Sequence, residues 1–322
     1  MTVTVAICTW NRCDSLRETL EQFCSLRVPS NTDWELLVIN NNCTDDTDAM
    51  VASFQARLPV RLLHEPTPGQ SYARNLAVRE ARGEYLLWTD DDVIVDSGWM
   101  ESLLVPLRDG TAEWSFGRSE PKWPGKVPAW YSDRFRGYFA VLDYGPTSYR
   151  ITNYLQHFYG LNFAGTVESH RALGGFRNDF GFKGDAGGVG EDVDLFQRAF
   201  DANMPIVYCP SALVKHVIPV QRTQKTYHRR RHWLANEVYY AVLPEMFPRA
   251  PWFLGLPRFF FGHAAIDVGA YLRSLLSGNR SEAFYYELRL VRFARLLLEA
   301  ARNGFRRPAA PAVAAVKESI GS

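Results

Sequence analysis

The stretch YLLWTDDD, residues Tyr85–Asp92, joins an apolar β-strand to three consecutive carboxylates. Its first half is rich in the aromatic and aliphatic residues that favour strands. Carboxylates crowded at the end of a strand repel one another, and a divalent cation is the usual way to stabilise them. A solvated acidic turn would explain the triplet alone equally well. The neighbouring sequence therefore has to distinguish a metal site from a surface turn.

Strands and helices alternate on the N-terminal side of this stretch. Short β-rich runs at Val3–Cys8, Trp34–Ile39 and Val60–Leu63 are separated by segments with helical periodicity. This alternation predicts an α/β fold, with a mostly parallel sheet that is flanked by helices. Ligands of such sheets bind at the C-terminal ends of the strands. The loops predicted to meet at that edge are Thr9–Arg12, Asn40–Asp46, Glu65–Gln70 and Asp90–Asp92.

The sequence beyond the triplet is less regular. Trp114–Tyr159 is rich in Trp, Pro, Gly and Tyr and has no clear period, so it is predicted to be a loop-rich region. Leu161–Ala164 and Pro205–Tyr208 are predicted to be further strands. Gly181–Gly190 carries five glycines and is predicted to be a mobile loop. A helix is expected over Glu191–Ala202.

Composition indicates a globular protein with enough chain for about two domains, or for one α/β domain with an extension. The chain has 322 residues, of which 47% are hydrophobic, and five cysteines without a Cys-x-x-Cys pair. This cysteine usage favours a reducing cytoplasm. We recognise neither a signal peptide nor a membrane span, because charged residues and a proline interrupt Trp252–Leu276, the most apolar candidate.

The C-terminal third is basic and helical. Residues 222–307 hold 15 Lys and Arg against six Asp and Glu, which suggests contact with an anionic membrane surface. Over Glu282–Arg302 one expected helix face carries Arg289, Arg292, Arg295, Glu299 and Arg302, and the other carries Leu290, Phe293, Ala294, Leu297 and Ala301. This pattern fits an interfacial membrane helix or an ordinary helix that covers the core. We divide the chain into a catalytic domain over 1–220 (halves 1–110 and 111–220), a helical extension over 221–307 and a disordered tail over 308–322.

Several motifs occur in an order that resembles glycosyltransferase family 2, whose members have the GT-A fold. The resemblance covers about residues 2–220. It rests on VAICTWNR at residues 5–12, LVINNNCTDDT at 37–47, Gly69 with Ala73-Arg74-Asn75, the aspartate triplet, Gly174-Gly175-Phe176 and Gly190-Glu191-Asp192. It implies an inverting, metal-dependent enzyme that moves a sugar from a nucleoside-diphosphate sugar to a hydroxyl group. A UDP-sugar donor and a glycan or lipid-linked acceptor, in polysaccharide or glycoconjugate biosynthesis, are the expected substrates.

The resemblance also assigns roles to individual residues. Asp92 and Asp90 would bind Mg²⁺ or Mn²⁺, and His216 could add an imidazole ligand or be an ordinary surface or core residue. Asp192 would take the proton of the acceptor hydroxyl, and Glu191 would position the acceptor or the base. Both carboxylates could instead stabilise a helix N-terminus, and the two roles are compatible.

Contacts to the donor nucleotide are expected from the loops at the sheet edge. Trp10 replaces a more usual tyrosine and could stack on the base or belong to the core. Asn40 replaces a common aspartate, and its amide oxygen can still accept a hydrogen bond from the base. Arg74 could bind the diphosphate or form a helix-surface salt bridge. The full expected set is Thr9, Trp10, Asn11, Arg12, Asn40, Gly69, Arg74, Asn75, Asp90 and Asp91.

Two other classes of protein share parts of this pattern. A sugar-nucleotide nucleotidyltransferase would carry a Gly-rich basic loop where this chain has Thr9–Arg12, and a non-catalytic glycan-binding module would not need all the carboxylates. The basic cluster His228–Trp233 lacks the Gln-x-x-Arg-Trp motif of processive synthases, and it could hold a phosphate or form a solvated helix face. We expect no nucleic-acid partner. The expected location is cytoplasmic, with peripheral attachment to the inner face of the cell membrane through the C-terminal helices as an alternative.

Overall fold

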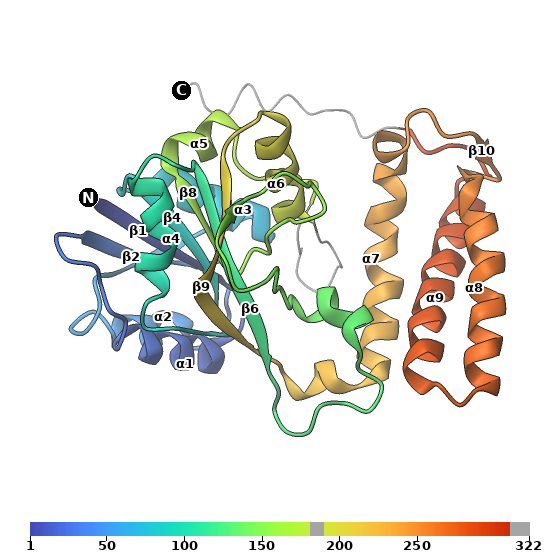
Figure 1. Cartoon of the computed structure of the whole chain (residues 1–322), viewed down its shortest axis with the longest axis horizontal. Coiled ribbons are helices and arrows are strands. Elements are labelled where there is room, and N and C mark those ends of the chain that lie inside the picture. The colour runs from blue at the N-terminus through green and yellow to red at the C-terminus, as the bar shows by residue number, and fades with distance from the viewer. Residues whose placement is uncertain (181–189, 310–322) are drawn as a thin grey trace. The chain divides into compact units, whose positions relative to one another are not determined.

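A computed structural model describes residues 1–180 and 190–309 of the chain (Figure 1). The predicted mobile loop therefore lies outside the described residues except for Gly190, and so does the predicted tail from residue 310 on. The described chain forms two compact units. The first comprises residues 1–124, 136–180 and 190–218, and the second comprises 125–135 and 219–309.

The first unit begins with the predicted alternation of strands and helices. β1, β2, β3 and β4 are all parallel, in the order β3-β2-β1-β4. Their bounds and those of the connecting helices are β1 Thr2–Thr9, α1 Cys13–Phe23, β2 Asp33–Asn40, α2 Thr47–Ala52, β3 Val60–His64, α3 Gln70–Glu80 and β4 Tyr85–Asp90. The prediction of a parallel half-sheet with helical crossovers is confirmed.

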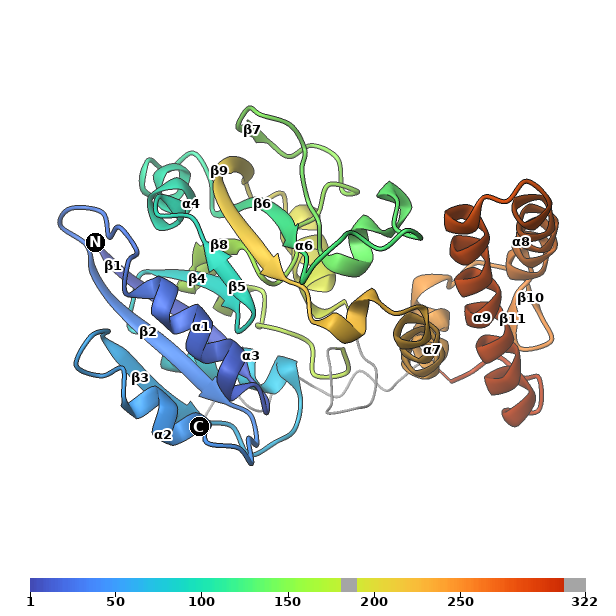
Figure 2. The same cartoon turned by 90° about the horizontal axis from the view of Figure 1, so that it is seen from below.

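The second half of the same sheet is mixed. After β4 the order continues β8-β6-β9-β5, and β7 pairs with β9 (Figure 2). β8 is antiparallel to both β4 and β6, whereas β6 and β9 are parallel to each other. The bounds are β5 Val93–Val95, α4 Trp99–Arg108, β6 Trp114–Lys122, β7 Tyr149–Arg150, β8 Phe163–Thr166, α5 Val167–Ala172, α6 Glu191–Asp201 and β9 Ile206–Val217.

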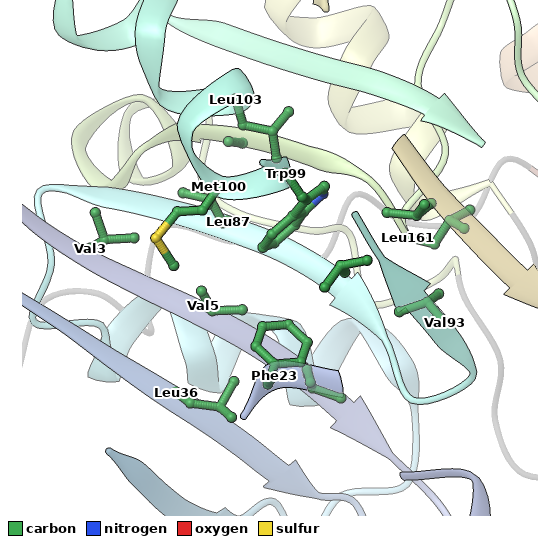
Figure 3. Close-up of a cluster of buried hydrophobic side chains, with 14 of the residues drawn as sticks. Val3, Val5, Phe23, Leu36, Leu87, Val93, Trp99, Met100, Leu103 and Leu161 are labelled. Atoms are coloured by element: carbon green, nitrogen blue, oxygen red, sulfur yellow. The ribbon is translucent and has the colours of Figure 1, made fainter. Parts of the chain in front are cut away.

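Both faces of the sheet are covered, because alternate residues of each strand point to opposite sides. On β1, Val3 and Val5 join a cluster with α1, α2 and α4, which includes Phe23 and Trp99 (Figure 3). The opposite face packs on α3, α5 and α6 in a second cluster. Burial on both sides explains why the parallel strands are almost continuously apolar.

Strand β6 corrects the prediction that Trp114–Tyr159 begins as a loop. A Cβ at Gly117 would lie 1.9 Å from the carbonyl oxygen of Ala212 on β9, so only glycine fits between these strands. Gly117 and Pro121 both argue against a strand in the sequence, and burial on both faces removes the alternating pattern. The hydrophobic periodicity of the sequence therefore did not reveal this strand.

The second unit is mainly helical. It consists of α7 Lys225–Met246, a hairpin of β10 Trp252–Phe253 and β11 Leu256–Pro257, α8 Phe259–Leu276 and α9 Arg280–Arg302. Residues 125–135 belong to this unit: Trp130 packs edge-to-face on Phe284 of α9, with ring centroids 4.9 Å apart. Among the helices of residues 1–180 and 190–309, we find none whose length and apolar character would suffice to cross a membrane.

Helix α9 corrects the expected division into a charged face and an apolar face. It packs against both α7 and α8, so part of its charged face is covered. Arg295 is buried and lies over the ring of Trp233, whereas Ala294, on the expected apolar face, is exposed. Long arginine stems and flat guanidinium groups pack well on aromatic rings. A prediction that places every charged residue of a helix on its solvent-exposed face therefore misplaces such arginines.

The basic cluster His228–Trp233 is only partly internal, since Arg230 and Trp233 are exposed. His228 is buried and hydrogen-bonds the carbonyl oxygen of Arg222 at 2.7 Å. Arg229 forms an ion pair with Glu287 of α9. Burial lowers the pKa of His228 to about 4. His228 and Arg229 therefore stabilise the helical unit, whereas Arg230 is exposed.

Candidate active site

The register of the parallel strands brings the predicted loops to one edge. Cys8 on β1 pairs with Ile39 on β2 and with Asp90 on β4, and Thr9 pairs with Asn40. The carboxyl ends of β1, β2 and β4 therefore lie side by side. Loops from this edge carry most of the polar residues that the sequence singled out.

Asp91 and Asp92 are both buried, and Asp91 is the less exposed of the two. Its carboxylate accepts hydrogen bonds from Thr9 Oγ1 at 2.8 Å and from the Arg12 guanidinium at 2.9 Å. Burial raises the pKa of Asp91 to about 6, although Arg12 opposes this shift. The same Arg12 nitrogen lies 2.9 Å from Asp92 Oδ2. Thr9 and Arg12 thus hold the loop of the triplet in place, and half of the Arg12 side chain remains exposed.

His216 reaches Asp92 from the other half of the sheet. β9 pairs with β5, so that His216 lies opposite Val93, next to the triplet. His216 Nδ1 lies 2.8 Å from the carbonyl oxygen of Phe139, and a carbonyl only accepts, so Nδ1 carries a proton. His216 Nε2 faces Asp92 Oδ2 at 3.5 Å. A neutral imidazole nitrogen beside a carboxylate is a donor set that suits Mn²⁺ or Mg²⁺.

Asp90 stands apart from this pair. Its carboxylate lies 3.7 Å from the Arg74 guanidinium, and burial, as the main cause, raises its pKa. No three acidic, histidine or cysteine side chains of the described residues form a ready-made metal cluster. The chemistry of Asp92 and His216 fits a divalent cation. Asp90 lies in the same loop and is available as a further oxygen ligand.

Arg74 connects the triplet to the second group of carboxylates. It is only 2% exposed and forms an ion pair with Glu191 Oε1 at 3.0 Å. Its guanidinium carbon also lies 5.2 Å from the ring centroid of Phe176. A Cβ at Gly160 would lie 2.1 Å from Arg74 Nη2, so a larger residue there would displace the buried guanidinium. The guanidinium is an internal link between β4, α3 and α6, and not the surface salt bridge that was the alternative.

Glu191 and Asp192 begin α6 and differ in environment. Glu191 is buried, and burial raises its pKa to about 7, with the neighbouring Asp192 as a further cause. Asp192 is partly exposed, and two backbone N–H groups hold its carboxylate. Gly160 N donates to Oδ2 at 2.7 Å, and Val193 N donates to Oδ1 at 2.8 Å. Each oxygen keeps a further lone pair, so Asp192 is an oriented carboxylate that can still accept a proton from a substrate.

Trp10 presents a flat face at the sheet edge. Its side chain is 41% exposed, which excludes the core as an explanation. The neighbouring Asn11 has a left-handed backbone with φ 51°, and its amide oxygen accepts a hydrogen bond from Thr44 N at 2.7 Å. Asn11 therefore fixes the loop that carries Trp10.

Asn40 is buried and already engaged. Its amide nitrogen donates to Asp48 Oδ1 at 2.6 Å, and its oxygen accepts from Cys43 N at 2.7 Å. These bonds shape the loop after β2. They leave one lone pair of the Asn40 oxygen for the expected contact with a base.

Asn75 and Gly69 serve the local structure of the site. Asn75 exchanges hydrogen bonds with the backbone of Phe176 at 2.7 and 2.8 Å, which ties α3 to the Gly174–Phe176 turn. Gly69 has φ 145°, and its N–H donates to the side chain of Asn41 at 2.8 Å. Asn41 also donates to the carbonyl oxygens of Glu65 and Thr67. It clamps the loop before α3, although sequence reasoning gave it no role.

Two backbone groups of the site were also missed. The Gly160 N–H holds Asp192, and the Phe139 carbonyl fixes the His216 ring. No sequence pattern marks either position, since any residue type supplies a backbone group. The close approach of Arg74 to Gly160 becomes visible only in the structure.

Ligands of open α/β sheets bind outside the carboxyl ends of the strands, and the carboxylates of the aspartate triplet lie at that edge. The chain belongs to glycosyl transferase family 2, whose sequence profile matches residues 4–172. It is 24% identical over 258 residues to the succinoglycan biosynthesis protein ExoM of Rhizobium meliloti (strain 1021). That alignment covers 76% of this chain and 75% of ExoM.

Solved structures show the same GT-A fold. The mannosyltransferase PcManGT from Pyrobaculum calidifontis, in complex with GDP-Man and Mn²⁺, matches with a TM-score of 0.59 at 19% identity. The match covers 94% of this chain and 86% of that chain. S. aureus TarS 1-349 in complex with UDP-GlcNAc matches with a TM-score of 0.53 at 14% identity, over 94% and 92% of the two chains. The family and fold that the motifs suggested are confirmed.

Proposed function

We propose that this chain is an inverting glycosyltransferase in which Asp192 is the catalytic base and the aspartate triplet serves the leaving diphosphate. One observation supports this most directly. Arg74 joins Asp90 at the end of β4 to Glu191 at the start of α6, so the two acidic groups belong to a single site. Glu191 is buried and Asp192 is partly exposed, so we assign the positioning role to Glu191 and the role of base to Asp192.

The proposed reaction is a single displacement. The acceptor oxygen attacks the anomeric carbon, and the bond from that carbon to the diphosphate oxygen breaks with its electron pair leaving on the nucleoside diphosphate. The hydroxyl proton passes to an oxygen of Asp192, whose orientation Gly160 N and Val193 N maintain. Attack from the face opposite the leaving group inverts the configuration at the anomeric carbon.

Asp92 and His216, with Asp90, would hold Mg²⁺ or Mn²⁺. When bound, the cation supplies positive charge against the departing diphosphate. Arg12 lies beside Asp92 with half of its side chain exposed, and can move toward the same phosphate oxygens. The buried Arg74 would act through Glu191 and Asp90, in place of the direct diphosphate contact expected from the sequence.

We propose a UDP-sugar as donor, with the base stacked on Trp10. The exposed face of Trp10 and the remaining lone pair of Asn40 support this choice. UDP-GlcNAc is the ligand of the TarS complex, whereas PcManGT was solved with GDP-Man, so a GDP-sugar is the competing donor. Titration of UDP and GDP in the presence of Mn²⁺ distinguishes them.

We propose a glycan or lipid-linked acceptor on the cytoplasmic side of a membrane. The relative ExoM is named for succinoglycan biosynthesis, which supports a role in building a polysaccharide. The five cysteines are all free, as expected in a reducing compartment.

The central test is the substitution Asp192→Asn, measured by turnover and by calorimetry with UDP and Mn²⁺. Loss of the base should lower kcat by about 10²–10⁴-fold while nucleotide binding is preserved. Asp194→Asn is the matched control, because Asp194 lies on the same helix and pairs with Arg198. Turnover retained in Asp192→Asn would reject Asp192 as the base, and the absence of metal-dependent nucleotide binding by the unmodified protein would reject the proposed function.

A further inference from the structure

The second unit contains a hollow between α7, α8 and α9 that the proposed transfer reaction does not use. Its volume is about 190 Å³, and its walls combine aromatic rings, including Tyr239 and Phe260, with Arg289, Arg292 and one carboxylate, Asp267. Sites for drug-sized ligands usually measure about 300–1,000 Å³, so a nucleotide sugar is too large for it. The hollow has the size and chemistry for a small anionic group.

The two arginines of the hollow differ in their partners. Arg289 forms an ion pair with Asp267 of α8, at 2.8 Å from Nε to Oδ1. Arg292 stacks on Tyr239, with its guanidinium carbon 4.2 Å from the ring centroid. Among the side chains that the structure describes, no carboxylate forms an ion pair with Arg292, and its buried Nε–H has no hydrogen-bond acceptor. A guanidinium stacked between rings and lacking an acceptor is ready to bind an anion.

Helix α8, which forms one wall of the hollow, is apolar on its outer side. Exposed fractions are 68% for Ile266, 53% for Leu272 and 91% for Leu276, and Phe259 at the rim of the hollow is also exposed. Several large apolar side chains exposed on one helix in this way indicate an interaction site. Figures 1 and 2 show α8 beside α9 along its whole length, which leaves this outer side without a neighbouring helix of the unit.

The hairpin before α8 extends the apolar surface. Phe253 and Leu254 are exposed at its tip, and Phe253 packs edge-to-face on Phe261 in the first turn of α8, with centroids 5.3 Å apart. Leu254 adopts a left-handed backbone with φ 44°, a conformation that is unfavourable for leucine. The hairpin thus holds a strained leucine at an exposed tip, where a glycine or asparagine would be less costly.

The charges on α8 favour one partner over a second copy of the chain. Arg258 and Arg273 are exposed at either end of the apolar surface, and the only acidic residue of α8, Asp267, is buried against Arg289. A two-fold contact through this face would bring arginines together without compensating carboxylates. The phosphate surface of an anionic membrane supplies the complementary charge.

We propose that the second unit binds an anionic phospholipid, with the phosphate in the hollow beside Arg292 and the acyl chains along the apolar side of α8. The hairpin tip and α8 would enter the interfacial layer of the membrane, and the arginines would contact head groups. This assigns membrane binding to α8 and not to the charged face of α9. The proposal is independent of the transfer reaction, because it is measured without donor or acceptor.

Flotation of the full chain with vesicles tests the proposal. Wild-type protein should float with vesicles of phosphatidylcholine and phosphatidic acid and bind pure phosphatidylcholine more weakly. The double substitution Ile266→Glu with Leu272→Glu should abolish flotation with either. Val220→Glu is the matched control, since Val220 is an exposed apolar residue outside α8.

Arg292→Gln should weaken binding to the phosphatidic acid vesicles by about tenfold and leave phosphatidylcholine binding unchanged. Arg292→Lys should retain most of the affinity, and Arg230→Gln removes an equal charge from an exposed site on α7. Equal losses in Arg292→Gln and Arg230→Gln would overturn the role of the hollow. Displacement from vesicles by millimolar inorganic phosphate would show that the hollow takes free phosphate instead.

The oligomeric state separates the remaining occupants of the apolar face. A dimer of the wild-type chain that dissociates in the Ile266→Glu, Leu272→Glu variant, without vesicle binding, would overturn the lipid proposal in favour of a second copy. A monomer that floats only after removal of residues 310–322 would show that the tail covers the face. Either result contradicts the lipid proposal for the full chain.

Discussion

Arg74 occupies a position where burial and charge oppose each other. A guanidinium that is 2% exposed must be compensated, and Glu191 and Asp90 compensate it from two different elements. Loss of either partner would leave a buried charge, which is typically costly. The pair with Glu191 therefore fixes the start of α6, and with it the direction of the Asp192 carboxylate.

Glu191→Gln should change how stability depends on pH. Burial raises the pKa of Glu191 from 4.5 to about 7, so the folded protein binds this proton more tightly than the unfolded chain does. The resulting stability is fully present below pH 4.5 and is lost as pH rises through 7. Glutamine does not titrate, so the variant should gain stability relative to the wild type between pH 5 and pH 8, by up to about 3 kcal/mol, on top of a pH-independent loss from removing a partner of the buried Arg74.

Urea unfolding of both proteins at the two pH values measures this difference. Other carboxylates with raised pKa values, such as Asp91, are common to both proteins and cancel in the comparison. Glu168→Gln, at an exposed position on α5, is the control and should show a gap that does not change with pH. A constant gap for Glu191→Gln would contradict the raised pKa.

Trp10→Ala should weaken donor binding without loss of stability. Stacking of a base on an aromatic ring is worth about 1–3 kcal/mol, so the Kd for UDP should rise roughly tenfold or more. Trp10→Phe should restore most of the affinity because it keeps a flat face. Calorimetry with UDP and Mn²⁺ gives the Kd, and Tyr154→Ala removes a comparably exposed aromatic ring as a control. An unchanged Kd in Trp10→Ala would remove Trp10 from the donor site.

The side chains of the candidate site were largely predictable, and the groups that orient them were not. Carboxylates at a strand end follow from charge repulsion and sheet topology, so Asp90, Asp91 and Asp92 could be singled out at once. The sequence could not show that Asn75 would be occupied by the backbone of Phe176. Such bonds depend on how distant segments meet.

Among the elements, β6 illustrates the strictest packing requirement. Gly117→Ala would place a methyl group 1.9 Å from the carbonyl oxygen of Ala212, so β6 and β9 would have to separate. Overpacking of this kind typically costs about 1–3 kcal/mol. Gly125→Ala is the matched control, because a Cβ there meets nothing within 4 Å. Urea unfolding should show a lower midpoint for Gly117→Ala alone, and an equal midpoint would mean that the strands can absorb the methyl group.

The prediction of elements succeeded where one physical signal dominated. β1 to β4 were found within a few residues because fully buried parallel strands are short, apolar and separated by amphipathic helices. β6 was missed because glycine and proline are usually signs of a loop. α9 was found, but its faces were wrong because arginines that pack on aromatic rings look like solvent-exposed residues in the sequence.

At the scale of the whole molecule, the two units are not two consecutive stretches of the chain. Residues 125–135 lie between two segments of the first unit in sequence, yet they belong to the second. Trp130 contacts Phe284, its indole N–H donates to the carbonyl oxygen of Thr223, and Arg134 pairs with Glu282. A fragment that ends at residue 218 would therefore expose an aromatic segment whose partners are missing.

We expect a chain truncated after Ile218 to bind more of the dye ANS than the full chain, since Trp130 and Phe135 lose their contacts with Phe284. Substitution of Trp130 and Phe135 by serine in the truncated chain should reduce the excess. ANS fluorescence at equal protein concentration gives the comparison. A truncated chain with no excess dye binding would show that residues 125–135 find other cover.

β9 makes the completion of the site a late event in synthesis. This strand pairs with β5, β6 and β7, and among the strands of the large sheet it is the last to leave the ribosome. A nascent chain that stops short of β9 already contains β1 to β4, which form the donor edge. Its strands β5 and β7 are still unpaired, because their partner β9 comes later in the sequence. Until His216 emerges, the chain resembles an aggregation-prone intermediate. The rate of translation through the segment before β9 should therefore influence the yield of soluble enzyme.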